Sequence, residues 1–447
     1  MDGLPDDWEM HFFGNLIQAP DGDFDEDFVP NLQEYLVGSD PTGGPPLLYV
    51  DRSVTSSGNG TSWQTAFRTI QEGISAATDG HAVVVAEGTY PEQIHFHGKR
   101  IRLRSTDPLD PVVVANTIIA AAKGGRVITF AGTEDETCVL SGFTIRNGKA
   151  PYGGGICGGT PTIHARATIE HNVITGNSAT GDSASGGGIA FCDGRIQGNV
   201  ILANMATGQN ANGGGLGCCH GLIQNNVIGE NFAEGEGGGL FDCDSVIRGN
   251  TISMNSALSG GGLAACDGMV KNCIIWGNLP LGADGELYLS SVPSFSCIEE
   301  WTGGGKGNIS KIPRFVAPEN HDFRLKADSP CIDAGSNDPD LLEFDIAGAH
   351  RIMFGGKSLT ADMGAYEFYI NKLEPVPGTD DVVFTWSCLA EKTYSIFYTE
   401  DLFDWHTAID NFPSSGNTTT SWTDDGVLTD VPPSLAPKRF YRVLENP

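Results

Sequence analysis

The middle of the chain is built from a repeat. A run of three glycines begins at residues 153, 186, 213, 237 and 260, which gives repeat lengths of 33, 27, 24 and 23 residues. Between these runs the pattern Asn-x-Ile-x-x-Asn recurs, as in Asn172–Asn177 and Asn250–Asn255. Short apolar stretches at this period, with no amphipathic helix pattern, are typical of a solenoid of short parallel strands. Collagen is excluded, because its glycines occur at every third residue.

The repeat also predicts which side chains stack inside the solenoid. Identical residues on successive coils lie about 4.8 Å apart in such a fold. We therefore expect an internal asparagine ladder in which side-chain amides hydrogen-bond along the stack. Its members are the asparagines at 147, 177, 204, 231, 255 and 278. The glycine runs predict corners that need positive φ or close packing, which accounts for much of the 60 glycines among 447 residues.

A column of cysteines follows the glycine runs. Its members are Cys192, Cys219, Cys243 and Cys266, with Cys157 near the first run. Free cysteine behaves as a small buried hydrophobic residue, so an interior thiol ladder is favoured. The alternative is a thiolate metal site helped by Cys218 and His220, but metal ligands cluster at one place and this column has one thiol per coil. Eleven cysteines, an odd number, exclude a fully paired disulfide framework.

The two ends of the repeat carry further signals. Tyr49-Val-Asp51 and Gly58–Trp63 precede an apolar pattern at helical spacing over residues 68–77, which predicts a helix that caps the core. Residues 83–90 and 101–104 follow as predicted first strands. With the closing segments Ser329–Gly335 and Ala361–Phe368, the pattern resembles the pectate-lyase-like β-helix proteins that bacteria secrete. The resemblance covers residues 47–370 and implies a right-handed parallel β-helix with a polysaccharide or cell-surface glycan as partner.

The N-terminal segment is acidic and predicts a calcium loop. Carboxylate and amide side chains follow EF-hand spacing from residue 23 to residue 34. The candidate Ca²⁺ ligands are Asp23, Asp25, Asp27, Asn31 and Glu34. Phe28 stands where such loops carry glycine, so a solvated acidic linker is the alternative. Residues 1–41 also resemble thrombospondin-type-3-like calcium repeats of secreted proteins, which implies export to an extracellular or cell-surface location.

Short alternating strands at residues 382–386, 393–398, 418–422 and 439–443 predict a C-terminal antiparallel β-sandwich. This segment resembles a fibronectin-III-like module, which implies a spacer or a binding role. The sequence thus predicts an all-β chain of three parts. They are residues 1–46 with the calcium-loop module and linker, 47–370 with the β-helix, and 371–447 with the sandwich.

The net charge of −30 narrows the choice of partners. Nucleic acids and anionic membrane surfaces need cationic patches, so neither is expected. No run of 18 apolar residues occurs, so no membrane span is expected. The first residues show no signal-peptide pattern, so we expect either a cytosolic protein or a chain whose signal peptide has been removed. The secreted relatives imply the second.

Two columns of polar residues are candidates for chemistry. The turn column contains Asp193, His220, Asp244 and Asp267. These side chains predict either calcium binding and acid–base chemistry or simple capping of a recurring turn. The strand column contains Glu170, Gln197, Gln224, Arg248 and Lys271, which should face outward.

Arg248 and Lys271 on neighbouring coils predict a local cationic spot. Such a spot could neutralise a uronate carboxylate and abstract a proton in β-elimination, or it could pair with Asp244 and Asp267 as solvated ions. The candidate catalytic residues are therefore Arg248, Lys271, Asp244 and Asp267.

The functional hypothesis from the sequence is a carbohydrate-active protein, either a polysaccharide lyase or a glycoside hydrolase, acting on an acidic or marine polysaccharide. The alternative is a non-catalytic surface adhesin or scaffold. The Asn-Thr-Asp, Asp-Asp and Gly-His-Gly motifs of galacturonases are absent from the sequence, which keeps the alternative open.

Overall fold

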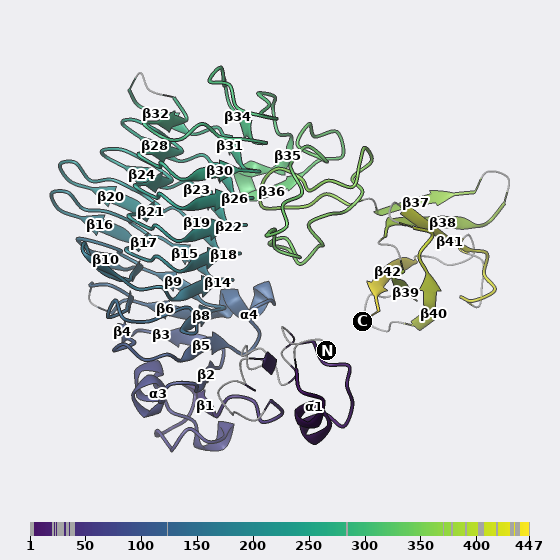
Figure 1. Cartoon of the computed structure of the whole chain (residues 1–447), viewed down its shortest axis with the longest axis horizontal. Helices are drawn as coiled ribbons and strands as arrows, with labels where there is room; N and C mark the ends of the chain where they lie inside the picture. Colours follow the sequence, from purple (N-terminus) through teal and green to yellow (C-terminus); the bar gives the residue numbers. More distant parts are fainter. Residues whose placement is uncertain are drawn as a thin grey trace. The chain divides into compact units, whose positions relative to one another are not determined.

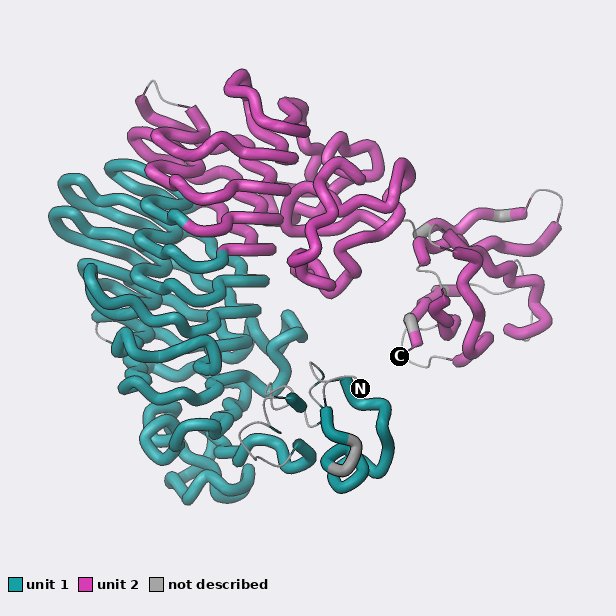
Figure 2. Tube along the Cα trace, in the orientation of Figure 1, with its two compact units in different colours: residues 1–222, 231–244 teal, residues 223–230, 245–447 magenta. Residues whose placement is uncertain are grey.

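A computed structural model gives the fold of the chain. It describes residues 4–19, 22, 24, 31–32, 35, 41–122, 124–282, 285–369, 371–376, 379–388, 391–400, 406–416, 419–429, 433 and 439–446. The chain divides into two compact units, residues 1–222 with 231–244 and residues 223–230 with 245–447 (Figures 1 and 2). The proposed boundaries after residues 46 and 370 remain predictions.

The first unit is a parallel β-helix whose coils add strands to four sheets (Figure 1). The first sheet contains β1 (Leu47–Val50), β2 (Ala82–Val85), β5 (Arg102–Ser105), β8 (Val139–Ser141), β14 (Thr168–Glu170) and β18 (Arg195–Gln197). The second contains β3 (Gly88–Tyr90), β6 (Thr117–Ala120), β9 (Thr144–Arg146), β15 (Val173–Thr175) and β19 (Val200–Leu202). The third contains β4 (Ile94–His95), β7 (Ile128–Thr129), β11 (Ile156–Cys157), β17 (Ile189–Ala190), β21 (Leu216–Gly217) and β25 (Leu240–Phe241). The fourth contains β10 (Lys149–Ala150), β16 (Ser178–Thr180), β20 (Met205–Thr207) and β24 (Phe232–Ala233), and β12 (Gly159–Thr160) pairs antiparallel with β13 (Ile163–His164).

The second unit repeats the parallel coil and then changes architecture. Its coils add β22 (Leu222–Gln224), β26 (Val246–Arg248) and β30 (Met269–Lys271) to the first sheet, and β23 (Val227–Gly229), β27 (Thr251–Ser253), β31 (Ile274–Trp276) and β34 (Cys297–Ile298) to the second. They add β29 (Leu263–Ala264) and β33 (Leu287–Tyr288) to the third sheet, and β28 (Ser256–Ala257) and β32 (Leu279–Pro280) to the fourth. The hairpin of β35 (Phe315–Ala317) and β36 (Asp322–Leu325), joined by the 3-10 turn η2 (Pro318–Asn320), follows. The prediction of a parallel β-helix is confirmed.

The C-terminal residues form two antiparallel three-stranded sheets, as predicted. One has the order β37 (Asn371–Pro375), β38 (Val382–Ser387), β41 (Thr419–Asp424), and the other β40 (His406–Pro413), β39 (Thr393–Thr399), β42 (Phe440–Glu445). Buried aromatic side chains from both sheets, Trp386 and Trp422 from one and Tyr394 from the other, share one core. The sandwich is therefore held by large apolar side chains packed between the sheets.

The interior of the coils follows the predicted inward column. Ile169 and Ile174 pair in register with Ile196 and Ile201 on the next coil, and all four are fully buried. Each apolar side chain thus packs on its equivalent one coil away. This stacking buries a continuous core although each strand of the coils has only two to four residues.

The predicted helix caps the core at the start of the coils. Helix α3 (Ile70–Ala76) begins with a capping box between Thr69 and Glu72. Its buried Ile70 and Ile74 face the core, and Gly73 lies so close to Val50 and Val83 that a Cβ atom would come within 2.9 Å of both. The first strand is Leu47–Val50, one strand earlier than predicted, because these residues pair in parallel with β2.

The other described helices are α1 (Asp6–Phe12) and α4 (Pro111–Asn116), with a 3-10 turn η1 at Trp63–Thr65. Among the helices that the structure describes, none has the length and apolar character required to cross a bilayer.

Buried asparagines form the predicted ladder in the first unit. The Oδ1 atom of Asn204 accepts hydrogen bonds from N and Nδ2 of Asn177 at 3.1 and 3.0 Å. Asn204 in turn donates from N and Nδ2 to Oδ1 of Asn231, both at 3.0 Å. Asn172 and Asn199 repeat this arrangement as a second ladder. The side chains thereby satisfy buried backbone groups at the corners of successive coils.

Asn147 was wrongly predicted as a member of the ladder. Its φ of 63° places it in the left-handed region, and its side chain is exposed. The backbone N–H of Gly148 donates to Asn177 Oδ1 at 2.9 Å in its place. The ladder of the first unit therefore begins at Asn177.

The glycine runs behave as predicted. The first glycine of each run has φ between 54° and 65°. The later glycines lie against the next coil, and a Cβ on Gly187 would come within 2.4 Å of the carbonyl oxygens of Met205 and Gly214. Both reasons for glycine, positive φ and close backbone approach, therefore apply at one corner.

In the second unit the ladder ends on the carboxyl group of Glu286. Asn255 donates from N and Nδ2 to Oδ1 of Asn278 at 2.9 and 2.8 Å, and Asn278 donates to the two oxygens of Glu286 at 3.1 and 2.6 Å. Burial is the main cause that raises the pKa of Glu286 to about 8. Glu286 takes the place of the next asparagine, which the sequence did not predict.

The raised pKa of Glu286 predicts a pH dependence of stability. The folded state holds this proton from about pH 4.5 to about pH 8, whereas the unfolded chain releases it, so stability should fall as pH rises through this window. The slope from one such group is at most about 1.4 kcal/mol per pH unit. Glu286→Gln should flatten the slope in urea unfolding at pH 5, 6 and 7, and the exposed Glu300→Gln is the control. An unchanged slope in Glu286→Gln would contradict the assignment.

Candidate functional site

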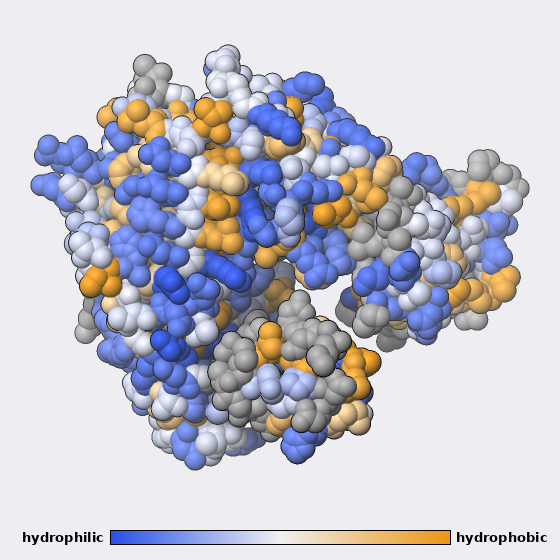
Figure 3. Space-filling view, in the orientation of Figure 1, coloured by the Kyte–Doolittle hydropathy of each residue, from blue (hydrophilic) through white to orange (hydrophobic). Residues whose placement is uncertain are grey.

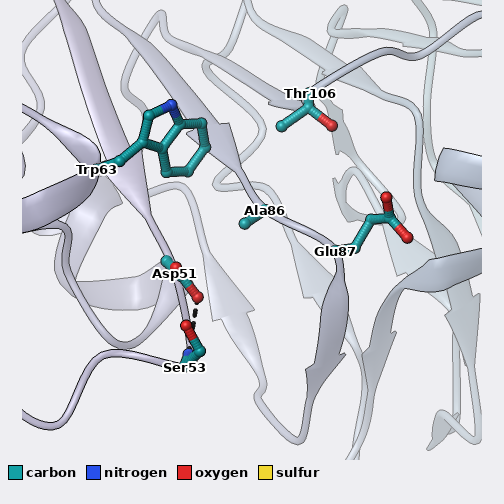
Figure 4. A pocket seen from close by; sticks show the side chains of 6 residues that line it. All are labelled: Asp51, Ser53, Trp63, Ala86, Glu87 and Thr106. Carbon is teal, nitrogen blue, oxygen red and sulfur yellow. Dashed lines mark hydrogen bonds between the residues drawn. The ribbon is translucent and has the colours of Figure 1, made fainter.

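A pocket lies where three neighbouring strands of the first sheet end. Val50 pairs with Val85, and Val85 pairs with Ser105, so Asp51, Ala86 and Thr106 follow side by side at the ends of β1, β2 and β5. The pocket has a volume of about 430 Å³. It is lined by Asp51, Ser53, Trp63, Ala86, Glu87 and Thr106 (Figure 4).

An aromatic ring and two carboxylates surround this pocket. In Figure 4 the indole of Trp63 and the carboxylate of Glu87 lie on either side of the small side chain of Ala86. Trp63 is 37% exposed, and its ring packs on Tyr49 with the ring centroids 4.6 Å apart. The Asp51 carboxylate accepts a hydrogen bond from Ser53 N at 2.7 Å, while Glu87 is exposed. An open aromatic face beside hydrogen-bond acceptors is suited to a ligand with one apolar face and several hydroxyls.

Local hydrogen bonds hold the walls of the pocket. Trp63 opens the η1 turn, whose N-cap Ser62 accepts a hydrogen bond from Thr65 N. Behind the pocket, the hydroxyl of Tyr90 donates to the carbonyl oxygen of Ala86 at 2.9 Å. Burial raises the pKa of Tyr90 to about 12, so this donor keeps its proton at neutral pH. The site is therefore preformed in the first coils.

Sequence reasoning placed Asp51 and Trp63 in the lead-in to the β-helix and did not identify the pocket. The available signal was that buried strands end in polar residues at Asp51, Glu87 and Thr106. That signal indicates a shared pocket only when the strands are known to be neighbours in register, because Ala86 lies 35 positions after Asp51 in the sequence.

Comparisons with known proteins give the following result. No protein-family model and no curated protein matches this chain. Among solved structures, pectate lyase Pel9A is similar at 13% identity with a TM-score of 0.44, over 72% of this chain and 96% of the lyase chain. A pectin methylesterase mutant in complex with a hexasaccharide is similar at 11% identity with a TM-score of 0.29, over 59% of this chain and 93% of the esterase chain. At these identities and TM-scores, the positions of active-site residues in the two structures cannot be carried over to this chain.

Arg248 and Lys271 lie on neighbouring strands in register, as the sequence predicted. They do not form an unpaired cationic spot, however. Lys271 Nζ lies 2.7 Å from Asp338 Oδ2, and the Arg248 guanidinium donates to Gln224 Oε1 at 2.9 Å and to the carbonyl oxygen of Asp340. The catalytic role of Arg248 and Lys271 remains a prediction. Either side chain could act on a substrate only after it is released from these partners.

A segment of the second unit covers this face of β22, β26 and β30. Phe344 O accepts a hydrogen bond from Asn225 Nδ2 at 3.0 Å, and Ser336 exchanges hydrogen bonds with the Asn272 side chain at 2.8 and 2.9 Å. Ala365 N donates to Thr251 Oγ1 at 3.0 Å. The strand column therefore faces away from the solenoid interior, as expected, but in this unit it is covered by the chain itself, and Gln224 is 3% exposed.

The turn column is brought together in the first unit. Asp193 Oδ1 accepts a hydrogen bond from the backbone N–H of His220 at 2.9 Å, and His220 Nδ1 lies 3.8 Å from Asp244 Oδ2. Asp193 thus caps a backbone group on the next coil and not in its own turn. Asp267 is exposed in the second unit, where its carbonyl oxygen accepts a hydrogen bond from Ser291 Oγ at 2.7 Å. The predicted catalytic roles of Asp244 and Asp267 remain predictions.

The cysteine column is the predicted interior thiol ladder. Cys157, Cys192, Cys219, Cys243 and Cys266 are fully buried, and none of these five is in a disulfide. Burial raises the pKa of the Cys157 and Cys192 thiols, which disfavours the thiolate form that metal binding needs. The alternative of a thiolate metal site in this column is therefore not supported.

The predicted calcium loop lies mostly outside the described residues. Asp23, Asp25, Asp27 and Glu34 are not described. Asn31 is buried, donates from Nδ2 to Ala19 O at 2.9 Å and accepts from Phe24 N at 3.4 Å. Calcium binding by this loop remains a prediction.

Proposed function

We propose that this chain is an extracellular, carbohydrate-active β-helix protein, and that the pocket around Trp63 holds a sugar ring of a polysaccharide or cell-surface glycan. The observation that supports this proposal is the pairing of an exposed indole with the Asp51 and Glu87 carboxylates in one preformed depression (Figure 4). A pyranose ring presents C–H groups on one face and hydroxyls at its edge. The indole would pack on the C–H face, while the carboxylates accept hydrogen bonds from hydroxyls.

The charge of the pocket lining favours a neutral polymer. On the face shown in Figure 3, the described hydrophobic residues are scattered among hydrophilic ones and form no single large field. The six lining residues include two carboxylates and no cationic side chain. Because carboxylates repel anions, a neutral glycan is favoured at this pocket, and an acidic polysaccharide would need bridging cations.

The reaction that fits this pocket best is glycoside hydrolysis. That reaction uses two carboxyl groups, one as acid and one as base or nucleophile, on either side of the scissile bond. Asp51 and Glu87 would supply such a pair. Elimination from a uronate needs a group that neutralises the substrate carboxylate, and none of the lining residues does this. A non-catalytic adhesin would use the same ring and acceptors for binding alone.

Trp63→Ala should weaken binding of the recognised oligosaccharide by about 10- to 100-fold, since the stacking face is lost. The ring is partly exposed, so the fold should be retained. We would find the ligand on a glycan array and measure its affinity by calorimetry. Trp301→Ala, at a tryptophan that does not line the pocket, is the matched control. Equal affinity in wild type and Trp63→Ala would place the sugar elsewhere.

Catalysis is tested on the same ligand. Glu87→Gln and Asp51→Asn keep side-chain size and should stop release of reducing ends while binding persists. Binding without release of reducing ends or of unsaturated products by the wild type would favour the adhesin or scaffold. A wild type that binds no glycan would overturn the proposal.

A further inference from the structure

We propose that His220, Asp242 and Asp244 form a binding site for a divalent transition-metal ion such as Zn²⁺. The site lies in the first unit, at the turns that follow β21 and β25. It is separate from the sugar pocket and does not depend on the proposed function. Neither the predicted calcium loop nor the cysteine column supplies any of its ligands.

Three ligand atoms converge at this place. One imidazole nitrogen and one oxygen from each carboxylate all lie within 4.8 Å of one another. His220 Nδ1 lies 3.8 Å from Asp244 Oδ2. Bonds from zinc to nitrogen or oxygen are about 2.1 Å long, so two ligand atoms on one tetrahedral ion lie about 3.4 Å apart. A small rotation of the half-exposed carboxylates would therefore close the site around an ion.

The register of the coils explains why these residues meet. Leu216 pairs with Leu240 and Gly217 with Phe241, so the residues that follow remain neighbours on adjacent coils. His220 then lies beside Asp244, four residues after Leu216 and Leu240 respectively. Asp242 adopts φ = 52°, a left-handed conformation that aspartate tolerates better than most residues. The turn thereby places two carboxylates near one imidazole.

The imidazole is held in place from the other side. Asp193 Oδ1 accepts the backbone N–H of His220 at 2.9 Å and also lies 3.0 Å from His164 Nδ1. The His164 ring stacks on the His220 ring with centroids 5.6 Å apart and planes 15° apart. Phe191 contacts the His164 ring at 5.0 Å between centroids. The orientation of His220 is therefore set before any ion binds, which lowers the entropic cost of binding.

One atom of the cluster points to a ligand independently of the carboxylates. His220 Nδ1 is shielded from solvent and makes no hydrogen bond within the described part of the chain. A shielded polar atom without a partner is costly, and coordination of an ion by its lone pair would remove that cost. The contact with Asp244 at 3.8 Å is too long for a hydrogen bond, so a simple histidine–aspartate pair does not satisfy this nitrogen.

The donor set selects the kind of ion. One nitrogen and two carboxylate oxygens suit Zn²⁺, Mn²⁺ or Co²⁺, whereas Ca²⁺ prefers oxygen ligands alone. The three protein ligands leave positions on the ion open for water.

The test is a calorimetric titration of the full chain with ZnCl₂ after removal of bound metal, in buffer with saturating CaCl₂ to occupy calcium sites. We expect the wild type to bind one zinc ion at this site. The affinity for zinc should fall about 100-fold in His220→Ala, because one of three protein ligands is lost. Asp244→Asn is an exposed, near-isosteric change that should weaken binding at least about tenfold if His220→Ala does not fold. Asp182→Asn removes an exposed carboxylate of the same unit outside the cluster and should bind like the wild type.

A Co²⁺-loaded wild type should also show visible ligand-field absorption that Asp244→Asn alters. Two results would overturn the proposal. One is a wild type that binds no zinc under these conditions. The other is zinc binding with the same affinity and stoichiometry in wild type, His220→Ala and Asp244→Asn, which would place the ion elsewhere.

Discussion

Replacing Asn204 by alanine is expected to lower the free energy of unfolding by about 3–5 kcal/mol. The Asn204 side chain is fully buried. Its Oδ1 accepts two hydrogen bonds from Asn177, and its Nδ2 donates to Ile174 O, Leu202 O and Asn231 Oδ1. Alanine would remove the acceptor of the Asn177 backbone N–H and the side-chain donor to Ile174 O and Leu202 O, in a place that water does not reach.

The measurement is urea unfolding of wild type and variant. Gln209→Ala is the control, because it removes an exposed amide side chain from the same coil and should change stability by less than about 0.5 kcal/mol. Asn204→Asp keeps the size and the acceptor oxygens but loses the Nδ2 donors, so it should also be strongly destabilised. If Asn204→Ala proves as stable as Gln209→Ala, the ladder is not what holds the corners together.

Replacing Arg351, in the second unit, by methionine is also expected to lower the free energy of unfolding by about 3–5 kcal/mol. Arg351 is 1% exposed and donates to Gly364 O at 3.0 Å and Asp362 O at 2.9 Å. Its Nη1 atom lies 3.8 Å from Glu367 Oε2. Burial raises the pKa of Asp362 and of Glu367, and the Arg351 guanidinium opposes that shift. Without the cation, two buried carbonyl oxygens lose their donors and the acids lose their counter-charge.

Arg324→Met is the matched control for Arg351→Met. Arg324 forms a two-bond contact with Asp322 at 2.6 and 2.8 Å, but its side chain is 64% exposed. A solvent-exposed ion pair contributes about 0–1 kcal/mol, so this variant should remain near wild type in urea unfolding. Equal stability losses in the two variants would show that burial does not decide the contribution of these arginines.

The Arg351 variant also bears on the predicted catalytic pair. Arg351 lies in the segment that covers β22, β26 and β30, and its Nη2 atom is near Gly249. Loosening this segment should expose Arg248 and Lys271. Protection of the amides of β26 and β30 in hydrogen exchange should therefore drop in Arg351→Met more than in Arg324→Met.

Several features of the candidate site could not be predicted from the sequence, for an identifiable reason. Asp51, Glu87 and Trp63 belong to segments separated by up to 36 residues, and only the pairing of β1 with β2 places them around one pocket. From the sequence, Arg248 and Lys271 were expected either to form a local cationic spot or to pair with Asp244 and Asp267 as solvated ions. The residues that pair with them, Asp338 and Asp340, lie more than 60 residues further along the chain.

By itself the sequence determined the coil of this protein. Glycine runs, stacked isoleucines, buried cysteines and the asparagines at 177, 204 and 231 recur once per coil, and a recurring local preference specifies the same turn and the same inward face in each copy. The tertiary structure alone decided where chemistry can occur. His220 faces Asp244 because coils stack in register, and Glu286 ends the ladder because no further asparagine is available at that position. Repeated contacts are local and periodic, so they can be read along the chain. A binding site joins residues from different coils and turns, so it exists only after those coils have packed.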